Sequence, residues 1–188
     1  MGIAIADCAA DAGAEVVLVL GPVNISTQNS SVRVVNVTDA ASMAKECTEL
    51  FHDCDIAILA AAVADFTPAG ISARKLKREG NEMIIKFKAT ADIAATLGEM
   101  KRPDQLVAGF ALETDNELEN AVAKLKKKNL DLIILNSLRD TGAGFGYDSN
   151  KITIIDRNNN IDKFELKSKK EAAADIIEKI AGMIIMTK

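Results

Sequence analysis

Short apolar runs alternate along the chain with segments whose apolar residues recur at helical spacing, and this alternation constrains the fold most strongly. Glu15–Leu20 (EVVLVL) and Ile56–Ala61 (IAILAA) are nearly continuous apolar runs, typical of strands covered on both faces of a parallel sheet. Between them, Asp39–His52 carries a stripe of apolar residues typical of a helix packed on one side. The alternation predicts an α/β fold with a doubly wound, mostly parallel, Rossmann-like sheet.

Other segments continue this pattern. We expect a first helix that ends at Gly13, a common helix stop. Further strands are expected at Ser31–Val37, Met83–Lys88, Leu106–Ala111 and Asp131–Leu135, and a further helix at Asp92–Met100. Phe66–Gly80 is polar and contains proline and glycine, so it is expected to be a long loop.

The last part of the chain predicts a β-hairpin followed by a helix. Lys151–Ile155 and Asp162–Leu166 are strand-like, and the asparagines at positions 158–160 are typical of the turn between them. The predicted sheet therefore ends in a C-terminal hairpin and helix.

Two capping boxes predict where helices begin. In this pattern a serine or threonine oxygen and a glutamate three residues later each accept from an unpaired backbone N–H. Ser168 and Glu171 predict a helix that runs to about Met186. Thr114 and Glu117 predict an earlier helix that ends near residue 128.

Length and composition exclude several classes of protein. At ~150 residues per domain, the 188 residues predict a single domain over positions 1–188. The formal net charge of −4 argues against broad nucleic-acid binding. The longest apolar run, at positions 56–64, is about half of what a membrane helix needs, and three cysteines cannot form a closed disulfide framework. We expect a cytoplasmic protein that binds neither membrane nor nucleic acid.

The start of the chain departs from the expected pattern. A nucleotide-binding fold of this class normally opens with a strand and a glycine-rich turn that leads into the first helix. This sequence opens directly with the helix. The pattern predicts a domain that is truncated at its N-terminus and lacks the first unit.

Small residues follow one predicted strand where ligands commonly bind. Ala60–Ala64 and Asp65 lie at the carboxyl end of the strand that begins at Ile56, and open α/β sheets bind ligands at this edge. Alanines let a base or sugar approach the backbone, and Asp65 can accept a hydrogen bond or help to position a metal. The alternative is tight helix packing on the alanines, with Asp65 in a turn.

Cations gather in two places. Arg74, Lys75, Lys77 and Arg78 suit a triphosphate whose charge must be neutralised, although such a run is also typical of a solvated loop. Lys124 and Lys128 share one helix face and suit terminal phosphates. Cations at a helix C-terminus are also favoured by the helix dipole without any ligand.

Other motifs point away from familiar chemistry. Gly142-x-Gly144-x-Gly146 precedes a strand, whereas the dinucleotide fingerprint requires a following helix, so we interpret it as a turn. The single histidine, His52, has no serine or cysteine nucleophile in a recognisable motif. No spacing of cysteine, histidine and acidic residues matches a metal site, so the metal ligands stay undefined.

The order of the motifs is specific. They run along the chain as AAAVADFTP (60–68), KLKR (75–78), TADIAATLG (90–98), GFALET (109–114), KLKKKNLDLIILN (124–136) and GAGFGYDSNKITII (142–155). In this order they resemble phosphopantothenoylcysteine synthetase of the bacterial type, which forms half of a bifunctional protein that also carries a decarboxylase. The resemblance covers nearly the whole chain.

The resemblance implies a ligase of coenzyme A biosynthesis that joins 4′-phosphopantothenate to L-cysteine with CTP and Mg²⁺. The pantothenate carboxylate attacks the α-phosphate to give an acyl-cytidylate and pyrophosphate. The cysteine amine then displaces CMP, so that a poor leaving group is replaced by a good one. The family also implies a homodimer with shared active sites, for which the hairpin at 151–166 is one contact surface, and a fused or associated decarboxylase domain.

The resemblance also assigns roles to residues. Lys75, in the K-x-K-K flap, would stabilise charge at the α-phosphate as the catalytic residue, and Arg78 replaces the last lysine of that motif. The other implied nucleotide-binding residues are Leu59, Ala60, Ala61, Asp65, Ala94, Ala95, Thr96, Leu97, Phe110, Lys124 and Lys128. The family's first strand and glycine-rich loop are absent, and with them an asparagine and an arginine implicated in substrate handling.

Two alternatives stay open. A non-catalytic nucleotide-binding or dimerisation module would retain these residues without turnover. A dinucleotide-dependent oxidoreductase is disfavoured because the chain lacks G-x-G-x-x-G and a matching ribose-binding acid.

Overall fold

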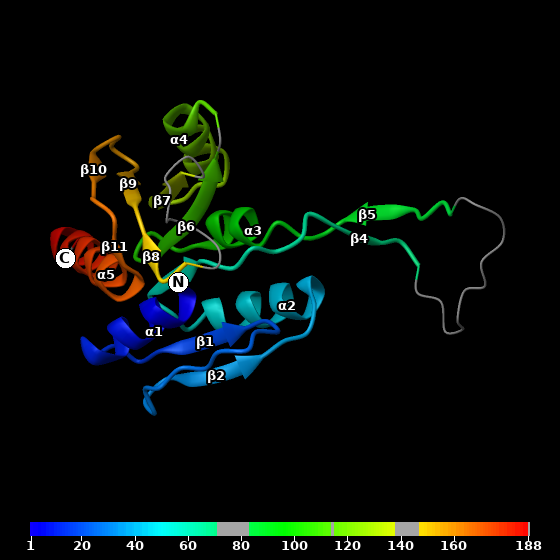
Figure 1. Ribbon diagram of the computed structural model, residues 1–188, viewed down its shortest axis with the longest axis horizontal. Helices are drawn as coiled ribbons and strands as arrows, with labels where there is room; N and C mark the ends of the chain where they lie inside the picture. Colours follow the sequence, from blue (N-terminus) through cyan, green and yellow to red (C-terminus); the bar gives the residue numbers. More distant parts are fainter. Residues whose placement is uncertain (71–82, 114, 138–146, 188) are drawn as a thin grey trace.

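A mixed five-stranded sheet forms the centre of the fold (Figure 1). The computed structural model describes residues 1–70, 83–113, 115–137 and 147–187. The strand order is β10-β9-β7-β6-β3. The strands are β3 (Ile56–Leu59), β6 (Leu106–Glu113), β7 (Leu132–Ser137), β9 (Ile152–Asp156) and β10 (Ile161–Lys163). β3, β6 and β7 are parallel, whereas β9 and β10 are antiparallel to their neighbours, so the hairpin turns a parallel sheet into a mixed one.

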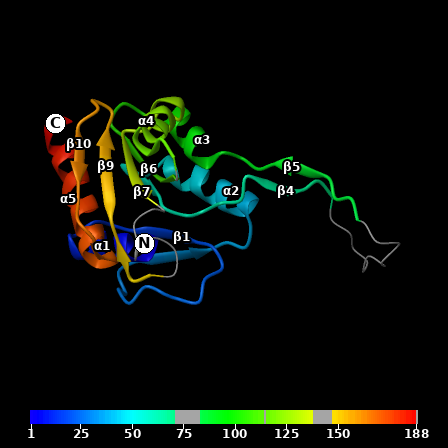
Figure 2. The ribbon, with the colours of Figure 1, turned by 45° about the horizontal axis from the view of Figure 1, so that its top comes forward.

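Helices cover both faces of this sheet (Figure 2). The helices are α1 (Gly2–Asp11), α2 (Ala40–Phe51), α3 (Ile93–Met100), α4 (Glu117–Lys127) and α5 (Lys169–Thr187). α1 and α5 pack on the face that carries Ala108, Ile134 and Ile154. α2, α3 and α4 pack on the other face, against Val107 and Ile133. The doubly wound arrangement expected from the sequence is confirmed for these elements.

The sheet is interrupted beside β3, which corrects the expectation of one continuous sheet. β1 (Val17–Leu20) and β2 (Arg33–Asn36) form a separate parallel pair. β1 and β3 were expected to be covered on both faces, yet every residue of both strands is only half-buried. Each has a strand neighbour on one side alone among the described strands, and that leaves their side chains partly open.

A two-stranded arm projects from the body (Figure 1). β4 (Phe66–Pro68) pairs with the antiparallel β5 (Phe87–Ala89). The expected loop at 66–80 therefore begins as a strand, because Phe66 and Thr67 pair across the arm. The expected strand at 83–88 is shifted to the end of that segment. The remainder of the expected loop lies outside the described residues from position 71.

Capping side chains set most of the helix starts. The carboxylates of Asp39 and Asp92 accept from backbone amides at the starts of α2 and α3. The Ser168–Glu171 capping box is confirmed, with Ser168 N donating to Glu171 and Glu171 N donating to Ser168 Oγ, and β11 (Lys167–Ser168) leads into it after pairing with β8 (Ser149–Asn150). Thr114, the first residue of the other expected box, lies outside the described residues; α4 begins after Asn116, which has a left-handed backbone at φ 46°.

The hairpin turn falls where it was expected. Asp156 accepts from the backbone amides of Asn158 and Asn160, and Asn159 adopts a positive φ of 62°. An asparagine tolerates this conformation better than most residues. In the described part of the chain, no helix is long and apolar enough to cross a bilayer.

Candidate functional site

A cavity of about 810 Å³ is lined by all of β1 and β3 and by the residues that follow each strand. Its walls include the segment after β3, the start of α3, the end of α4 and part of β6. Nine sequence-predicted site residues line it, namely Leu59, Ala60, Ala61, Asp65, Ala94, Leu97, Phe110, Lys124 and Lys128. The fold thus brings together residues from four separate segments of the sequence.

Three predicted site residues are not among those that line this cavity. Ala95 and Thr96 lie in the first turn of α3 but are not lining residues, whereas Ala94 and Leu97 of the same helix are. Lys75 lies outside the described residues.

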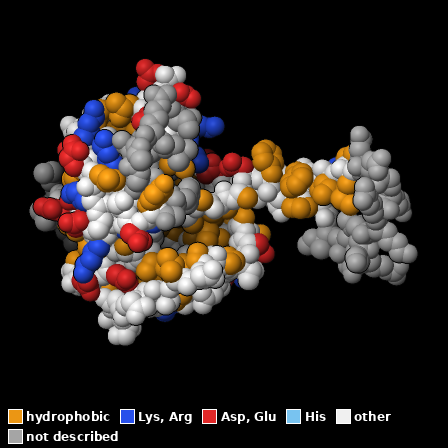
Figure 3. All heavy atoms as spheres, viewed as in Figure 1, with side chains coloured by type: hydrophobic (Ala, Val, Ile, Leu, Met, Phe, Trp, Pro, Cys, Tyr) orange, Lys and Arg blue, Asp and Glu red, His pale blue; other side chains and the backbone are white. Residues whose placement is uncertain are grey.

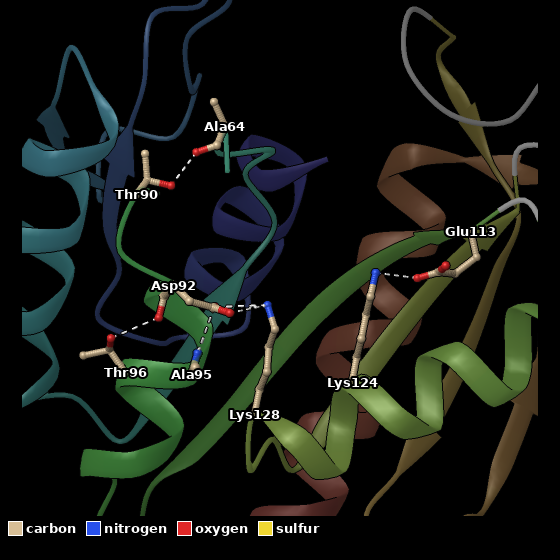
Figure 4. Close-up of polar contacts among 8 residues, drawn as sticks. All are labelled: Ala64, Thr90, Asp92, Ala95, Thr96, Glu113, Lys124 and Lys128. Atoms are coloured by element: carbon tan, nitrogen blue, oxygen red, sulfur yellow. Dashed lines mark hydrogen bonds and ion pairs between the residues drawn. The ribbon is translucent and has the colours of Figure 1, made fainter. Parts of the chain in front are cut away.

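Hydrogen bonds join two segments of the cavity lining. Thr90 Oγ1 donates to the carbonyl of Ala64 over 2.6 Å (Figure 4), and Thr90 N donates to the carbonyl of Asp65 over 2.9 Å. These bonds hold the segment after β3 next to the segment that enters α3, at the base of the arm. The backbone of Asp65 is thereby held in the lining of the cavity.

Close backbone packing explains how α3 and α4 meet. A Cβ at Gly98 would lie 1.9 Å from the carbonyl oxygen of Lys128, so only glycine fits there. Asn129 Nδ2 also donates to the carbonyl of Gly98 over 2.7 Å. The end of α4 is therefore held against α3, which places Lys128 beside the start of that helix.

Lys128 forms an ion pair with Asp92 at the start of α3 (Figure 4). Its Nζ lies 3.0 Å from the carboxylate, which also accepts from Ala95 N over 3.1 Å. Burial by itself raises the pKa of Asp92, but the hydrogen bonds from Lys128 and the Ala95 amide outweigh it and hold that pKa below its ordinary value. Asp92 is therefore a carboxylate at neutral pH.

Lys124 forms a second ion pair, with Glu113 at the end of β6 (Figure 4). The Glu113 side chain is only 12% exposed, whereas that of Lys124 is 46% exposed. Asn120 Nδ2 donates to the other carboxylate oxygen over 3.4 Å. The more exposed Lys124 side chain can therefore turn toward an anionic ligand, whereas the more buried Glu113 side chain is held in place.

The sequence analysis missed both carboxylate partners. Asp92 was recognised only as the first residue of a helix, and Glu113 only as part of a motif. An N-cap residue can be recognised from its neighbours in the sequence. No local pattern, however, indicates that Asp92 pairs with Lys128, 36 residues away. The two pairs place two lysines in the lining of the cavity, and one of them, Lys128, lies beside the start of α3, where backbone N–H groups also favour an anion.

Apolar and small groups form the rest of the site. Ala60 and Phe110 pack with α1 on one face of the sheet, whereas Leu59 packs on the other. A Cβ at Gly109 would lie 2.8 Å from Leu130 Cδ1, so glycine allows α4 to lie close to β6. The site therefore combines an apolar wall with exposed backbone at positions 60–64 and two cations, which suits a ligand with a flat ring and phosphates.

The described residues include no group of three or more histidine, cysteine or acidic side chains that could hold a metal ion.

Comparison with known proteins identifies relatives of this arrangement. Residues 1–184 match the family described as the DNA/pantothenate metabolism flavoprotein C-terminal domain. The chain is 60% identical over 184 residues to a protein from an unknown prokaryotic organism named Cysteine/Cysteine sulfinic acid decarboxylase. That match covers 98% of this chain and 51% of the relative.

A second relative has a different name. The chain is 37% identical over 183 residues to the Coenzyme A biosynthesis bifunctional protein CoaBC of Bacillus subtilis (strain 168), a match that covers 97% of this chain and 45% of that protein. The chain thus spans about half the length of these curated relatives.

Two solved structures are also similar to this chain. The crystal structure of the C-terminal domain of the bifunctional protein CoaBC has a TM-score of 0.81 at 35% identity, covering 97% of this chain and 81% of that one. The DNA/pantothenate metabolism flavoprotein from Streptococcus pneumoniae shares the fold, with a TM-score of 0.79 at 22% identity over 96% of this chain and 86% of that one. The chain belongs to the DNA/pantothenate metabolism flavoprotein C-terminal domain family, the phosphopantothenoylcysteine synthetase half of CoaBC.

Proposed function

We propose that this chain is a phosphopantothenate–cysteine ligase domain of coenzyme A biosynthesis that uses CTP. The observation that supports the proposal most strongly is the cavity. Of the eleven described residues that the family resemblance implies for the nucleotide, nine line it. These nine residues lie in or next to β3, α3, β6 and α4, which are far apart in the sequence. Their presence around one cavity supports a shared role in binding a ligand.

In this proposal the nucleotide lies along the carboxyl edge of the sheet. The backbone at Leu59–Ala61 binds the cytosine, which Phe110 contacts from the apolar wall. Lys124 and Lys128 bind phosphates after leaving Glu113 and Asp92. Each ammonium group exchanges one anionic partner for another and so stays paired, whereas Glu113 keeps its hydrogen bond from Asn120 and Asp92 keeps its hydrogen bond from the Ala95 amide.

The proposed reaction has two steps. A carboxylate oxygen of 4′-phosphopantothenate forms a bond to the α-phosphorus of CTP, and the bond to pyrophosphate breaks. The cysteine amine then attacks the activated carbonyl, CMP leaves, and the amine loses a proton. Lys75 stabilises the charge that develops on the α-phosphate in the first step. Mg²⁺, when bound, neutralises triphosphate charge.

A homodimer and a decarboxylase domain complete the proposal. Relatives of about twice this length include a bifunctional CoaBC protein, which supports a second, decarboxylating domain. The arm supports the homodimer. Pro68 and Phe87 are directly paired and therefore share one face of the arm with Phe66. Phe66 and Phe87 are 63% and 57% exposed, and a second copy of this face would cover them.

A second candidate function follows from the relative that is named a decarboxylase of cysteine or cysteine sulfinic acid. In that case the present domain would be a nucleotide-binding or dimerisation module that accompanies a decarboxylase and has lost the ligase reaction. The same cavity would bind a nucleotide without consuming it.

Release of pyrophosphate distinguishes the two functions. The 188-residue chain is incubated with CTP, Mg²⁺ and 4′-phosphopantothenate, with and without L-cysteine, and ATP replaces CTP in a parallel sample. The ligase proposal predicts CTP-selective release that depends on phosphopantothenate. Binding of CTP without release would favour the non-catalytic module.

A further inference from the structure

The two lysines of the candidate nucleotide site already have anionic partners within the protein. Lys124 is paired with Glu113, and Lys128 is paired with Asp92 (Figure 4). Figure 3 shows Lys and Arg side chains intermingled with Asp and Glu side chains at the end of the body that carries α3 and α4. An anionic ligand that binds either lysine must therefore compete with a carboxylate of the protein itself.

The two carboxylates differ in how much they lose when the lysine leaves. The Asp92 side chain is 50% exposed, and its carboxylate keeps the hydrogen bond from the Ala95 amide. The Glu113 side chain is only 12% exposed, and its other hydrogen bond within the described residues comes from Asn120 over 3.4 Å. A carboxylate that is largely removed from water and weakly hydrogen-bonded is costly to leave without a counter-ion. Glu113 is therefore the stronger competitor for its lysine.

Glu113 holds the Lys124 ammonium group from a position outside the cavity lining. Lys124 lines the cavity, whereas Glu113, at the end of β6, does not. The Lys124 side chain is about half-exposed and can turn between the two positions. A phosphate and the Glu113 carboxylate on the same ammonium group would lie close together and repel each other. The two anions therefore alternate on Lys124 instead of sharing it.

We propose that Glu113 is an internal competitor for the terminal phosphates of the nucleotide, an inference that rests on the proposed function. Since Lys75 is assigned there to the α-phosphate, the β- and γ-phosphates are left for the lysines of α4. Glu113 weakens the binding of CTP and of pyrophosphate because either ligand must displace it from Lys124. Glu113 does not contact the ligand and acts only through the lysine, so it is a positioning residue.

The competition favours the departure of pyrophosphate. Once the bond between the α- and β-phosphates is broken, the lysines of α4 hold a separate dianionic or more highly charged product. Return of Lys124 to Glu113 replaces the lost phosphate contact with an ion pair, so the ammonium group does not become unpaired as pyrophosphate leaves. The same exchange makes the binding of CTP weaker than two unpaired lysines would allow.

Titration calorimetry with CTP, and separately with inorganic pyrophosphate, tests the competition without any need for turnover. Glu113→Gln removes the charge but keeps the size of the side chain, so it should bind both ligands at least about fivefold more tightly than the parent does. Glu119→Gln is the matched control, because Glu119 is exposed on α4 and does not line the cavity. The control should change either affinity by less than about twofold. Unchanged or weaker binding by Glu113→Gln, or equal tightening by the control, would overturn the proposal.

A double substitution shows whether Glu113 acts through Lys124. In Lys124→Ala there is no lysine to compete for, so adding Glu113→Gln should change the affinity for either ligand by less than about twofold. An equal gain in the parent and Lys124→Ala backgrounds would show that Glu113 acts as a general repulsive charge. That result would overturn the positioning role.

Glu113→Asp provides a second variant in case Glu113→Gln does not fold, which the melting temperature of each protein reveals. It keeps the charge but withdraws the carboxylate from Lys124 by one methylene group, so it should tighten pyrophosphate binding by less than Glu113→Gln does. Absence of any tightening in a folded Glu113→Asp would also count against the competition.

The outcomes separate this inference from the proposed function. Weaker binding by Lys124→Ala without tighter binding by Glu113→Gln would overturn the competition and leave the nucleotide site intact. Failure of the parent to bind CTP would contradict the nucleotide site itself, and the competition with it.

Discussion

Lys128 Nζ donates to the Asp92 carboxylate over 3.0 Å and thereby joins the C-cap of α4 to the N-cap of α3. The two residues are 36 positions apart, and both line the candidate nucleotide cavity. Asp92 consequently has two tasks, since it caps α3 through the Ala95 amide and holds a lysine that can bind phosphate.

Asp92→Ala should destabilise the folded protein by about 1 kcal/mol, the usual effect of removing an N-cap side chain. Denaturant unfolding, followed by circular dichroism, measures the change. The matched control is Asp104→Ala, since Asp104 forms only an exposed pair with Arg102. The control should change the unfolding free energy by less than about 0.5 kcal/mol. Equal losses in the two variants would contradict the capping role.

The stability of the protein should fall at acidic pH partly through Asp156. Burial raises the pKa of Asp156, but hydrogen bonds from Asn160 and Asn158 and the charge of Lys179 outweigh it and lower that pKa overall. A lowered folded-state pKa means that the unfolded chain binds the proton more tightly. The contribution is therefore present above an unfolded pKa of about 3.9 and is lost as pH falls through the folded value.

Asp156→Asn removes this titration and should flatten the decline in stability below about pH 4, at the expense of lower stability near neutrality. Thermal unfolding between neutral and acidic pH checks the difference. Parallel pH profiles of the parent and Asp156→Asn would show that this carboxylate does not contribute.

The order of the main elements follows from local patterns. Apolar runs predicted β1, β3, β6 and β7, and apolar residues at helical spacing predicted α2 and α3. This works because burial of one or both faces of an element sets the spacing of its apolar residues, which can be recognised within that one segment. The Ser168–Glu171 box was also visible, since both partners lie within one helical turn. The left-handed backbone of Asn116 before α4 was not predictable from any pattern in the sequence, and the expected box at Thr114 lies outside the described residues.

Long-range pairing was not predictable in the same way. Nothing local in Val17–Leu20 or Ile56–Leu59 indicates which neighbour occupies each strand edge, so the separation of the β1–β2 pair from β3 is visible only in the fold. The pairing of β4 with β5, which sets Phe66 opposite Ala89 and Pro68 opposite Phe87, is likewise not indicated by either segment alone. In the site, Lys124 and Lys128 were predicted from their shared helix face, whereas Glu113 and Asp92 came from other elements.

The arm should carry the proposed dimer contact. Phe87→Ser removes an exposed aromatic ring from the apolar face of the arm and should shift the protein toward monomer in sedimentation velocity. Ile161→Ser is the matched control, since Ile161 is an exposed apolar residue of the β9–β10 hairpin, which the sequence suggested as a contact. Dissociation by Ile161→Ser alone would place the dimer contact on the hairpin instead of the arm.

Substitutions of Lys75 and Asp65 should affect CTP binding and turnover differently. Lys75→Ala should slow pyrophosphate release by about 100-fold while changing CTP affinity by less than about threefold, because the lysine acts on charge that develops in the transition state. Asp65→Ala should weaken CTP binding by about tenfold through loss of a hydrogen bond. Unchanged binding and turnover in Lys75→Ala would remove that lysine from the mechanism.

Titration calorimetry of CTP with Mg²⁺ against the parent, Lys128→Ala and Lys126→Ala tests the nucleotide site most directly. Lys126 is exposed on the same helix and does not line the cavity, so both substitutions remove one charge from α4. The cavity assignment predicts that Lys128→Ala weakens CTP binding by about tenfold or more, since a charge-assisted hydrogen bond to phosphate is lost, whereas Lys126→Ala changes it by less than about twofold. Equal affinities of Lys128→Ala and the parent would contradict the assignment of this cavity to the nucleotide.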